Sequence, residues 1–369
     1  MRIGTPIPVA PERRVALTPD SVGRLVKAGH EVVVEADCGR QAGHPDAAYE
    51  NAGASIGDPW AADLVAVVGL DDPARVRGHA AVVGLIRPLE EPERIAGLAE
   101  RDVTVLALEL LPRTTLAQSM DVLSSQATVA GYEAVLAAAT RSGRFFPMLT
   151  TAAGTVKPAR VLVLGAGVAG LQAIATARRL GAVVRAFDVR SAAAEQVESL
   201  GASFVEVDLS ADHTDAGGYA TELAADEQTR IIRGLDAEIT AADIVVTTAQ
   251  IPGRPAPLLI DDQSLAGAGA GTVIVDVAAA TGGNVSATVP GEEVEVHGVA
   301  VLGPTDLAAR LAGDASALYG RNIVNLLAHL VGEDGALTLD FDDEIADGVV
   351  VAHGGEVRHP RVRELLEDR

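Results

Sequence analysis

Short apolar runs alternate with amphipathic segments from the first residues onward. In the first third of the chain, five runs have the length and β-branched content of buried strands. They are residues 1–5, 30–36, 62–70, 79–86 and 103–109. Residues 18–29 have the pattern of a helix, with Thr18 as N-cap, Pro19 in the first turn and Gly29 as the stop. A second helix is expected at 90–102, so the pattern predicts βαβ units and a parallel sheet.

The middle of the chain repeats this alternation. Six further runs read as strands, at 160–165, 182–188, 203–208, 243–249, 272–277 and 297–303. Helical stretches such as 167–181 and 191–201 separate them. Six short strands with crossover helices suffice for a complete nucleotide-binding sheet. The two regions together predict two similar α/β domains.

Two longer helices are expected at 124–143 and 314–333. In the second, apolar residues recur on one side, at Leu318, Ile323, Leu326 and Leu330. Residues 336–369 read as a short hairpin and an acidic tail. We therefore predict an α/β fold of two Rossmann-like doubly wound parallel-sheet domains linked by long helices. The first domain is discontinuous, with 1–124 and 311–369, the second is 125–310, and the cleft between them is the expected ligand site.

Composition narrows the class of ligand and excludes several kinds of site. The net charge of -22 argues against nucleic acid or an anionic membrane surface as a direct ligand, because such ligands need concentrated Lys and Arg. Cys38 is the only cysteine, which excludes a disulfide framework and a multi-cysteine metal site, so no metal is expected. No apolar run reaches the ~18 residues of a membrane span, and the N-terminal residues lack the pattern of a signal peptide.

The segment GAGVAG at 165–170 is the most specific local motif. It follows a strand and opens a helix, and Asp188 ends the next strand, as in a dinucleotide-binding fingerprint. Gly165 makes the turn, Gly167 admits a pyrophosphate, and Gly170 lets the helix pack on the strand. The motif and its surroundings add Val168, Ala169, Val189 and Arg190 to the candidate cofactor-binding residues. A carboxylate at Asp188 favours NAD over NADP, and Arg190 could weaken that preference.

The segment PRTTLAQSMDVLSSQATVAGY at 112–132 is unusually polar for a region that then turns apolar. If 117–126 is helical, Gln118, Asp121 and Ser125 share one face. The segment is then either a site or a capped helix start, with Ser119 or Thr115 as cap and Asp121 complementing the helix dipole. The residues themselves leave both interpretations open.

Several segments together resemble the NAD(H)-binding component, domain I, of proton-translocating transhydrogenase, a family that shares its fold with alanine dehydrogenase. The resemblance rests on RVALTPDSV, on the polar segment at 112–132, on FPMLTTAAGTVKPARVLVLGAGVAGLQAIATARRLGA, and on AGGYA and TTAQIPGRPAP. It implies a protein that binds NAD(H) and passes a hydride directly to NADP held on a separate NADP(H)-binding component. It further implies a membrane-embedded partner component, a homodimer, and a cytoplasmic location at the inner face of the cell membrane through those partners.

The resemblance also implies roles for particular residues. Arg113 and Asp121 hold the nicotinamide end, Ser124 binds the carboxamide, and Gln118 reaches toward the partner's nucleotide. Gly218 and Tyr219 belong to a loop that closes over NAD. Further candidates line the cofactor pocket or match the wider family: Ala249, Gln250, Asp276, the TGGN run at 281–284, and Arg14.

The rival function, alanine dehydrogenation, needs an acid/base group and an anchor for the substrate carboxylate. The family's lysine has no counterpart in AVVGLDDP at 66–73, its histidine position falls at Leu85, and its acidic residue falls at Ala280. These losses favour transhydrogenation. An amino-acid oxidoreductase and a non-catalytic NAD-binding regulator remain the alternatives.

Overall fold

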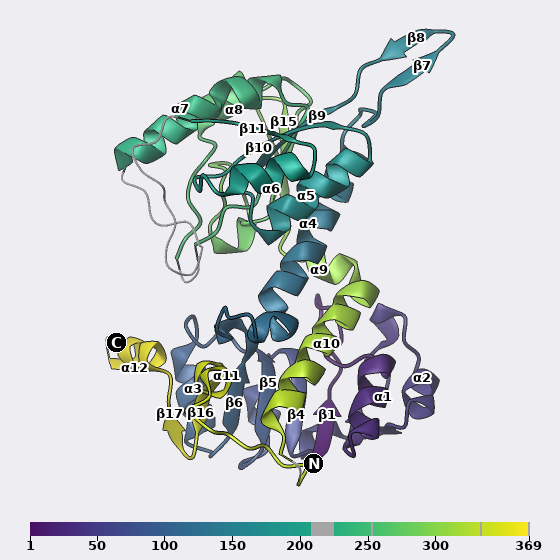
Figure 1. Cartoon of the computed structure of the whole chain (residues 1–369), viewed down its shortest axis with the longest axis vertical. Helices are drawn as coiled ribbons and strands as arrows, with labels where there is room; N and C mark the ends of the chain where they lie inside the picture. Colours follow the sequence, from purple (N-terminus) through teal and green to yellow (C-terminus); the bar gives the residue numbers. More distant parts are fainter. Residues whose placement is uncertain (208–224, 252–253, 333, 368–369) are drawn as a thin grey trace. The chain divides into compact units, whose positions relative to one another are not determined.

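The computed structural model describes residues 1–207, 225–251, 254–332 and 334–367. Two compact units make up the chain (Figure 1). Unit 1 comprises Met1–Gln126 and Ala308–Arg369, and unit 2 comprises Ala127–Leu307. Each unit is built on its own sheet with helices on both faces, so the α/β prediction of two doubly wound domains is confirmed.

Unit 1 contains an eight-stranded sheet in the order β17-β16-β6-β5-β4-β1-β2-β3. Its strands are β1 (Arg2–Thr5), β2 (Glu31–Val34), β3 (Ser55–Ile56), β4 (Leu64–Gly69), β5 (Ala81–Leu85), β6 (Thr104–Ala107), β16 (Val350–His353) and β17 (Glu356–Val357). The first six run parallel, while β16 is antiparallel to β6 and to β17. Both faces are buried: Leu64 and Ala66 of β4 belong to one apolar cluster, and Val65 and Val67 to another. The near-continuous apolar runs in the sequence follow from this two-sided burial.

Helices cover both faces of this sheet. They are α1 (Pro19–Lys27), α2 (Asp46–Asn51), α3 (Pro92–Ala99), α9 (Leu307–Arg310), α10 (Ala312–Leu330), α11 (Glu344–Val349) and α12 (Pro360–Glu367). The hydroxyl of Thr18 caps α1 by accepting from the Ser21 amide, as the sequence predicts. In α10, Ile323, Leu326 and Leu330 are buried as expected, while Leu318 is half-buried.

Unit 2 contains a seven-stranded sheet in the order β11-β10-β9-β12-β13-β15-β14. Its strands are β9 (Arg160–Leu164), β10 (Val183–Phe187), β11 (Ser203–Phe204), β12 (Ile244–Thr247), β13 (Val273–Asp276), β14 (Glu293–Val296) and β15 (Val299–Leu302). Among these described strands, β14 alone is antiparallel. The order reverses at β9, from which the chain proceeds outward first to β10 and β11 and later to β12 and β13. Such a switch point is where doubly wound sheets bind ligands.

The helices of unit 2 lie on both faces of this sheet. They are α5 (Val168–Arg179), α6 (Ala193–Ser199), α7 (Ala225–Ala241) and α8 (Asp262–Gly267). The chain crosses from unit 1 into unit 2 within α4 (Val122–Arg141) and returns near α9. A two-stranded hairpin, β7 (Leu149–Thr151) with β8 (Gly154–Val156), precedes β9.

The C-terminal region departs from the sequence prediction. The expected short hairpin is present as β16 and β17, but helices α11 and α12 flank it where a tail was expected. The residues of β16 complete the sheet of unit 1, because Val350 and Ala352 pair with Leu106 and Val105. The acidic residues of the tail occupy the exposed side of α12, whose Val362 is fully buried.

Candidate functional site

Three loops leave the unit 2 sheet at the same level. Leu164, the last residue of β9, pairs with Phe187 of β10 and with Thr247 of β12. Because these strands are parallel, the segments that follow them emerge at one edge. The glycine turn, Asp188 and the segment from Thr248 onward are therefore brought together.

The glycine turn requires glycine at two positions for steric reasons. Gly165 has φ +97°, and a side chain there would lie 2.7 Å from the Thr248 hydroxyl oxygen. A side chain at Gly170 would lie 1.8 Å from the carbonyl oxygen of Gly165. These contacts let α5 start directly against β9, as the sequence analysis expects of the two outer glycines.

Gly167 differs from its neighbours because an added side chain would meet no atom within 4 Å. It is the N-cap of α5, and no side chain caps that helix end. The next residue, Val168, is 40% exposed although it is apolar. Open space in front of uncapped helical amides fits a pyrophosphate, whose charge the amides and the helix dipole stabilise. Residues 165–170 thus fit a dinucleotide.

Asp188 and Arg190 form a tight pair beside the turn. The guanidinium donates from Nε to Oδ1 and from Nη2 to Oδ2 of Asp188, each at 2.8 Å. The Arg190 amide and the Ala166 amide donate to the same carboxylate, at 2.9 and 2.7 Å. Asp188 is nearly buried, and Val189 packs partly against the apolar cluster on one face of the sheet. The carboxylate lies where a ribose is bound in this fold, but Arg190 already occupies it.

Ala249 and Gln250 follow β12 at the same edge. The side-chain amide of Asn284 binds both backbone groups of Ala249, accepting from its amide at 3.1 Å and donating to its carbonyl at 2.9 Å. Gln250 is exposed. Asp276 is fully buried and accepts from two hydroxyls and three amides, including that of Asn284 at 2.7 Å. Asp276 and Asn284 therefore shape the loops and are less suited to contact a ligand.

The segment 112–126 differs from the single helix considered in the sequence analysis. A 3-10 turn, η5 (Ala117–Met120), is followed by Asp121 in an extended conformation, and α4 starts at Val122. Asp121 caps α4: Oδ1 accepts from the Ser124 amide at 2.9 Å, and Oδ2 accepts from the Ser124 hydroxyl at 2.6 Å. The cap is therefore Asp121 rather than Ser119 or Thr115. The chain bends at Asp121 because a helix cap takes non-helical dihedral angles.

The four residues expected at the nicotinamide end differ in exposure. Arg113 and Gln118 are exposed, whereas Asp121 and Ser124 are half-buried. Because the Ser124 hydroxyl donates its hydrogen to Asp121, its oxygen can still accept from an amide. Gly218 and Tyr219, the expected lid residues, lie outside the described residues.

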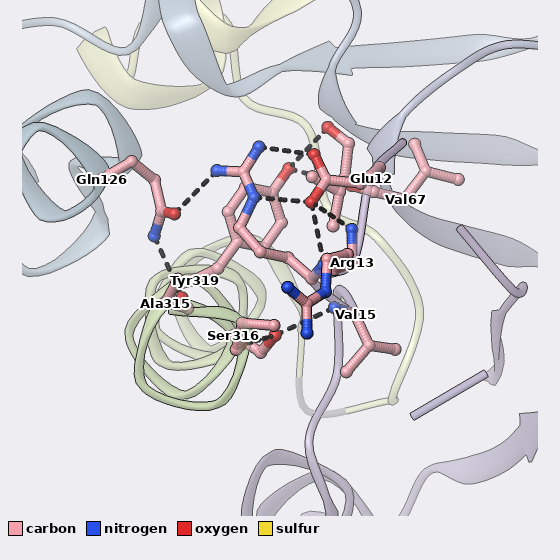
Figure 2. Close-up of polar contacts among 11 residues, drawn as sticks. Glu12, Arg13, Val15, Val67, Gln126, Ala315, Ser316 and Tyr319 are labelled. Atoms are coloured by element: carbon pink, nitrogen blue, oxygen red, sulfur yellow. Dashed lines mark hydrogen bonds and ion pairs between the residues drawn. The ribbon is translucent and has the colours of Figure 1, made fainter. Parts of the chain in front are cut away.

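Arg14 lies in unit 1 and is fully engaged there. Glu12 accepts from its Nε at 2.9 Å and from its Nη2 at 2.7 Å, and Gln126 accepts from its Nη1 at 2.7 Å. Burial alone would raise the pKa of Glu12, but the contacts with Arg14 outweigh it and lower the pKa. Figure 2 shows this cluster, in which the Tyr319 hydroxyl also donates to the Val67 carbonyl at 2.9 Å.

Hydrocarbon groups occupy the positions where the amino-acid dehydrogenase would need acid/base side chains. Leu70 is buried, Leu85 ends β5 and packs against the unit 1 core, and Ala280 is exposed after β13. Among the residues described, no three His, Cys, Asp or Glu side chains are grouped so as to hold a metal ion. The described helices include none long and apolar enough to cross a bilayer.

Two contributors to the site were missed in the sequence analysis. The Thr248 hydroxyl donates to the Gly165 carbonyl at 3.0 Å and so locks the turn to β12. Asn284 was noted only as a member of a turn. The available signal was position, since each residue follows a strand at the ligand-binding edge.

Comparison with known proteins places this geometry in a family. The chain matches the family models for the alanine dehydrogenase/PNT N-terminal domain over residues 8–130 and the C-terminal domain over 134–360. It is 44% identical to an NAD(P) transhydrogenase alpha subunit of Rhodospirillum rubrum, over 98% of each chain. A crystal structure of transhydrogenase from Sinorhizobium meliloti superposes with a TM-score of 0.87 at 42% identity, covering 97% of this chain and 100% of that one.

Similarity to the rival enzyme is weaker. Alanine dehydrogenase of Halomonas elongata is 28% identical over 96% of this chain and 94% of its own. The family and the Rossmann-like sheets imply binding of a nicotinamide dinucleotide and an oxidoreductase role in NAD(P) transhydrogenation. The chain therefore belongs to the alanine dehydrogenase/PNT family, among its members similar to NAD(P) transhydrogenase alpha subunits.

Proposed function

We propose that this chain is the NAD(H)-binding component of a proton-translocating transhydrogenase. It exchanges a hydride directly with NADP(H) held on a partner component, and a membrane-embedded component couples that transfer to proton movement. It acts as a homodimer at the cytoplasmic face of the membrane. The observation that carries the proposal is the 44% identity over 98% of both chains to the transhydrogenase alpha subunit of Rhodospirillum rubrum.

The unit 2 sheet supplies the binding groups. The amides after Gly167 hold the pyrophosphate, and Asp188 holds the adenosine ribose once Arg190 moves aside. Ala249 and Gln250 border the same pocket, at the end of β12. NAD is the nucleotide because a 2′-phosphate would meet the carboxylate of Asp188.

Residues 113–124 orient the reacting end. A nicotinamide ring supplies or takes the hydride when bound. Because no O–H or N–H proton moves in such a transfer, the chain needs no general base there. Its task is to fix the ring at near-attack distance and keep water away. Arg113 and Asp121 hold the ring, Ser124 accepts from the carboxamide, and Gln118, which is exposed, reaches the partner's nucleotide.

The acid/base side chains that amino-acid oxidation requires are replaced. Imine chemistry needs a proton donor and acceptor, where this chain has Leu85 and Ala280. A carboxylate anchor needs a free positive charge, but the guanidinium of Arg14 is neutralised by Glu12 at 2.7 Å. These features favour transhydrogenation over the dehydrogenase alternative.

A rate assay separates the candidate functions. The purified chain is mixed with an NADP(H)-binding component, and reduction of an NAD analogue by NADPH is followed. Transfer well above that of either component alone is expected. In parallel, NADH oxidation is followed with pyruvate and ammonia and no second component. Activity only in the parallel assay contradicts the proposal and favours the dehydrogenase, whereas tight NADH binding with neither activity favours the regulatory alternative.

A further inference from the structure

The segment carrying Gln118 and Asp121 is anchored from α10. The carbonyl of Ser119 accepts two hydrogen bonds, from Nδ2 of Asn322 and Nδ2 of Asn325, each at 2.9 Å. The segment has little regular structure of its own, since η5 is four residues long and no side chain caps its start. Its position therefore depends on these two amides.

Asn322 also binds the other side of the bend. Its Oδ1 accepts from the Ser125 hydroxyl at 2.7 Å, while its Nδ2 donates to Ser119. Ser119 precedes Asp121 and Ser125 follows it, so one amide group spans the bend. The orientation of the amide is fixed, because the Ser119 carbonyl can only accept and must face the nitrogen. Asn322 is 7% exposed, which shields both contacts from water.

The anchor continues into a longer polar network. Nδ2 and Oδ1 of Asn322 lead through Ser125 to Gln126, whose Nε2 lies 3.3 Å from the Ser125 hydroxyl and 3.1 Å from the Ala315 carbonyl. The Oε1 of Gln126 accepts from Arg14, which is paired with Glu12 (Figure 2). A buried network of satisfied groups is rigid, because moving one member leaves another unpaired.

We propose that Asn322 is a positioning residue for hydride transfer, fixing the bend at Asp121 so that Gln118, Asp121 and Ser124 present a nicotinamide in reacting geometry; this rests on the proposed function. Asn322 touches no reacting atom. Its effect arises because a displacement of ~1 Å from reacting geometry can cost about 100-fold in rate. The grip on the adenosine half of the nucleotide, in unit 2, does not depend on it.

Two variants remove the anchor in different ways. Asn322→Ala removes both contacts, whereas Asn322→Asp keeps an acceptor for Ser125 and loses the donor to Ser119. Asn325→Ala removes only the second, more exposed amide, and a smaller effect is expected. His329→Ala is the control, because His329 also lies on α10 but binds Asp343 at 3.0 Å, at the other end of that helix.

The experiment measures single-turnover hydride transfer with an NADP(H)-binding component, the dissociation constant of NADH, and thermal unfolding. For both Asn322 variants we expect transfer at least about 10-fold slower, with NADH affinity changed by less than about threefold. The His329 variant should transfer at the wild-type rate. The melting temperature checks that each variant is folded, and Asn322→Asp serves if the cavity in Asn322→Ala prevents folding.

The outcomes distinguish this inference from the proposed function. If the wild-type chain transfers hydride and both Asn322 variants match it, the inference is wrong and the function stands. The same conclusion follows if the variants slow only in proportion to lost NADH affinity. If the wild-type chain transfers no hydride to any NADP(H)-binding component tested, the proposed function fails and the inference fails with it.

Discussion

Arg190 binds Asp188 through both carboxylate oxygens, with Nε 2.8 Å from Oδ1 and Nη2 2.8 Å from Oδ2. Two backbone amides donate to the same group, from Ala166 and from Arg190 itself. A carboxylate has about four acceptor positions, so these donors saturate it. Ribose hydroxyls reach Asp188 only when the guanidinium swings away, and the displaced cation is then available to a 2′-phosphate.

Removing this guanidinium should sharpen the preference for NADH. In Arg190→Ala, Asp188 is free for the ribose and no cation remains to attract a phosphate. We expect NADH to bind at least as tightly and NADPH more weakly, raising the affinity ratio about 10-fold, which corresponds to ~1.4 kcal/mol. Titration calorimetry with both nucleotides measures the ratio. Tighter NADPH binding in the variant would show that Arg190 does not favour the phosphate.

The glycines of the turn should separate stability from binding. In Gly170→Ala the new carbon would lie 1.8 Å from the Gly165 carbonyl oxygen, so the backbone must shift. Such overpacking destabilises a fold by about 1–3 kcal/mol. In Gly167→Ala no atom lies within 4 Å, so stability should change by less than about 1 kcal/mol. NADH affinity should nevertheless fall about 10-fold or more, because the added methyl group occupies the phosphate space.

Urea unfolding and NADH titration check this pair of variants together. A Gly167→Ala protein that binds NADH normally would place the pyrophosphate elsewhere. A Gly170→Ala protein as stable as wild type would contradict the packing of α5 against β9.

Asp121 and Ser124 should likewise be separable. Asp121→Ala removes the α4 cap and should cost about 1 kcal/mol of unfolding free energy, as well as slowing hydride transfer. In Ser124→Ala the backbone amide still donates to Asp121, so the cap persists and stability should change by less than about 0.5 kcal/mol. Transfer should still slow, because the carboxamide loses its acceptor. Unaltered transfer in Ser124→Ala would limit that serine to a structural role.

Glu109 should make stability depend on pH near neutrality. Burial raises the pKa of this carboxyl to about 7, although its Oε1 accepts from the Arg87 amide at 2.5 Å. The folded state therefore keeps a proton that the unfolded chain releases near its ordinary value of 4.5. The contribution to stability is present below about pH 4.5 and is lost as the pH rises through 7.

The Glu109→Gln variant tests that dependence. Its stability relative to wild type should rise by on the order of 2–3 kcal/mol between pH 4.5 and 8, since glutamine does not titrate. Urea unfolding of both proteins across this range measures the difference. A difference that stays constant with pH would mean that Glu109 titrates near its ordinary value.

The sequence predicted best where burial is two-sided. Runs such as 160–165 and 243–249 are apolar throughout because both faces of β9 and β12 are covered, and their order follows from βαβ connectivity. The hairpin of β7 and β8 was missed, because its residues are mostly exposed and carry no alternation. Strand β16 was read only as one arm of a hairpin, since its place beside β6 depends on pairing across more than 240 residues.

The candidate site divides in the same way. Gly165, Gly170 and Asp188 could be placed from local spacing, because a strand, a turn and a helix are continuous in sequence. The bend at Asp121 could not, because Ala117–Met120 and Val122 onward are each helical and only a tertiary contact separates them. The contact is Asn322 with Ser119, about 200 residues apart. The saturation of Asp188 by Arg190 was also invisible, since it depends on a side-chain rotamer.

Transfer of deuterium from NADH tests the central claim most directly. NADH labelled at the transferable C4 position is mixed with this chain, an NADP(H)-binding component and NADP⁺ in ordinary water, and the products are analysed by mass spectrometry. Direct transfer between nicotinamides predicts that the deuterium appears in NADPH without dilution by solvent hydrogen. NADPH without the label, or no labelled NADPH at all, would contradict the account.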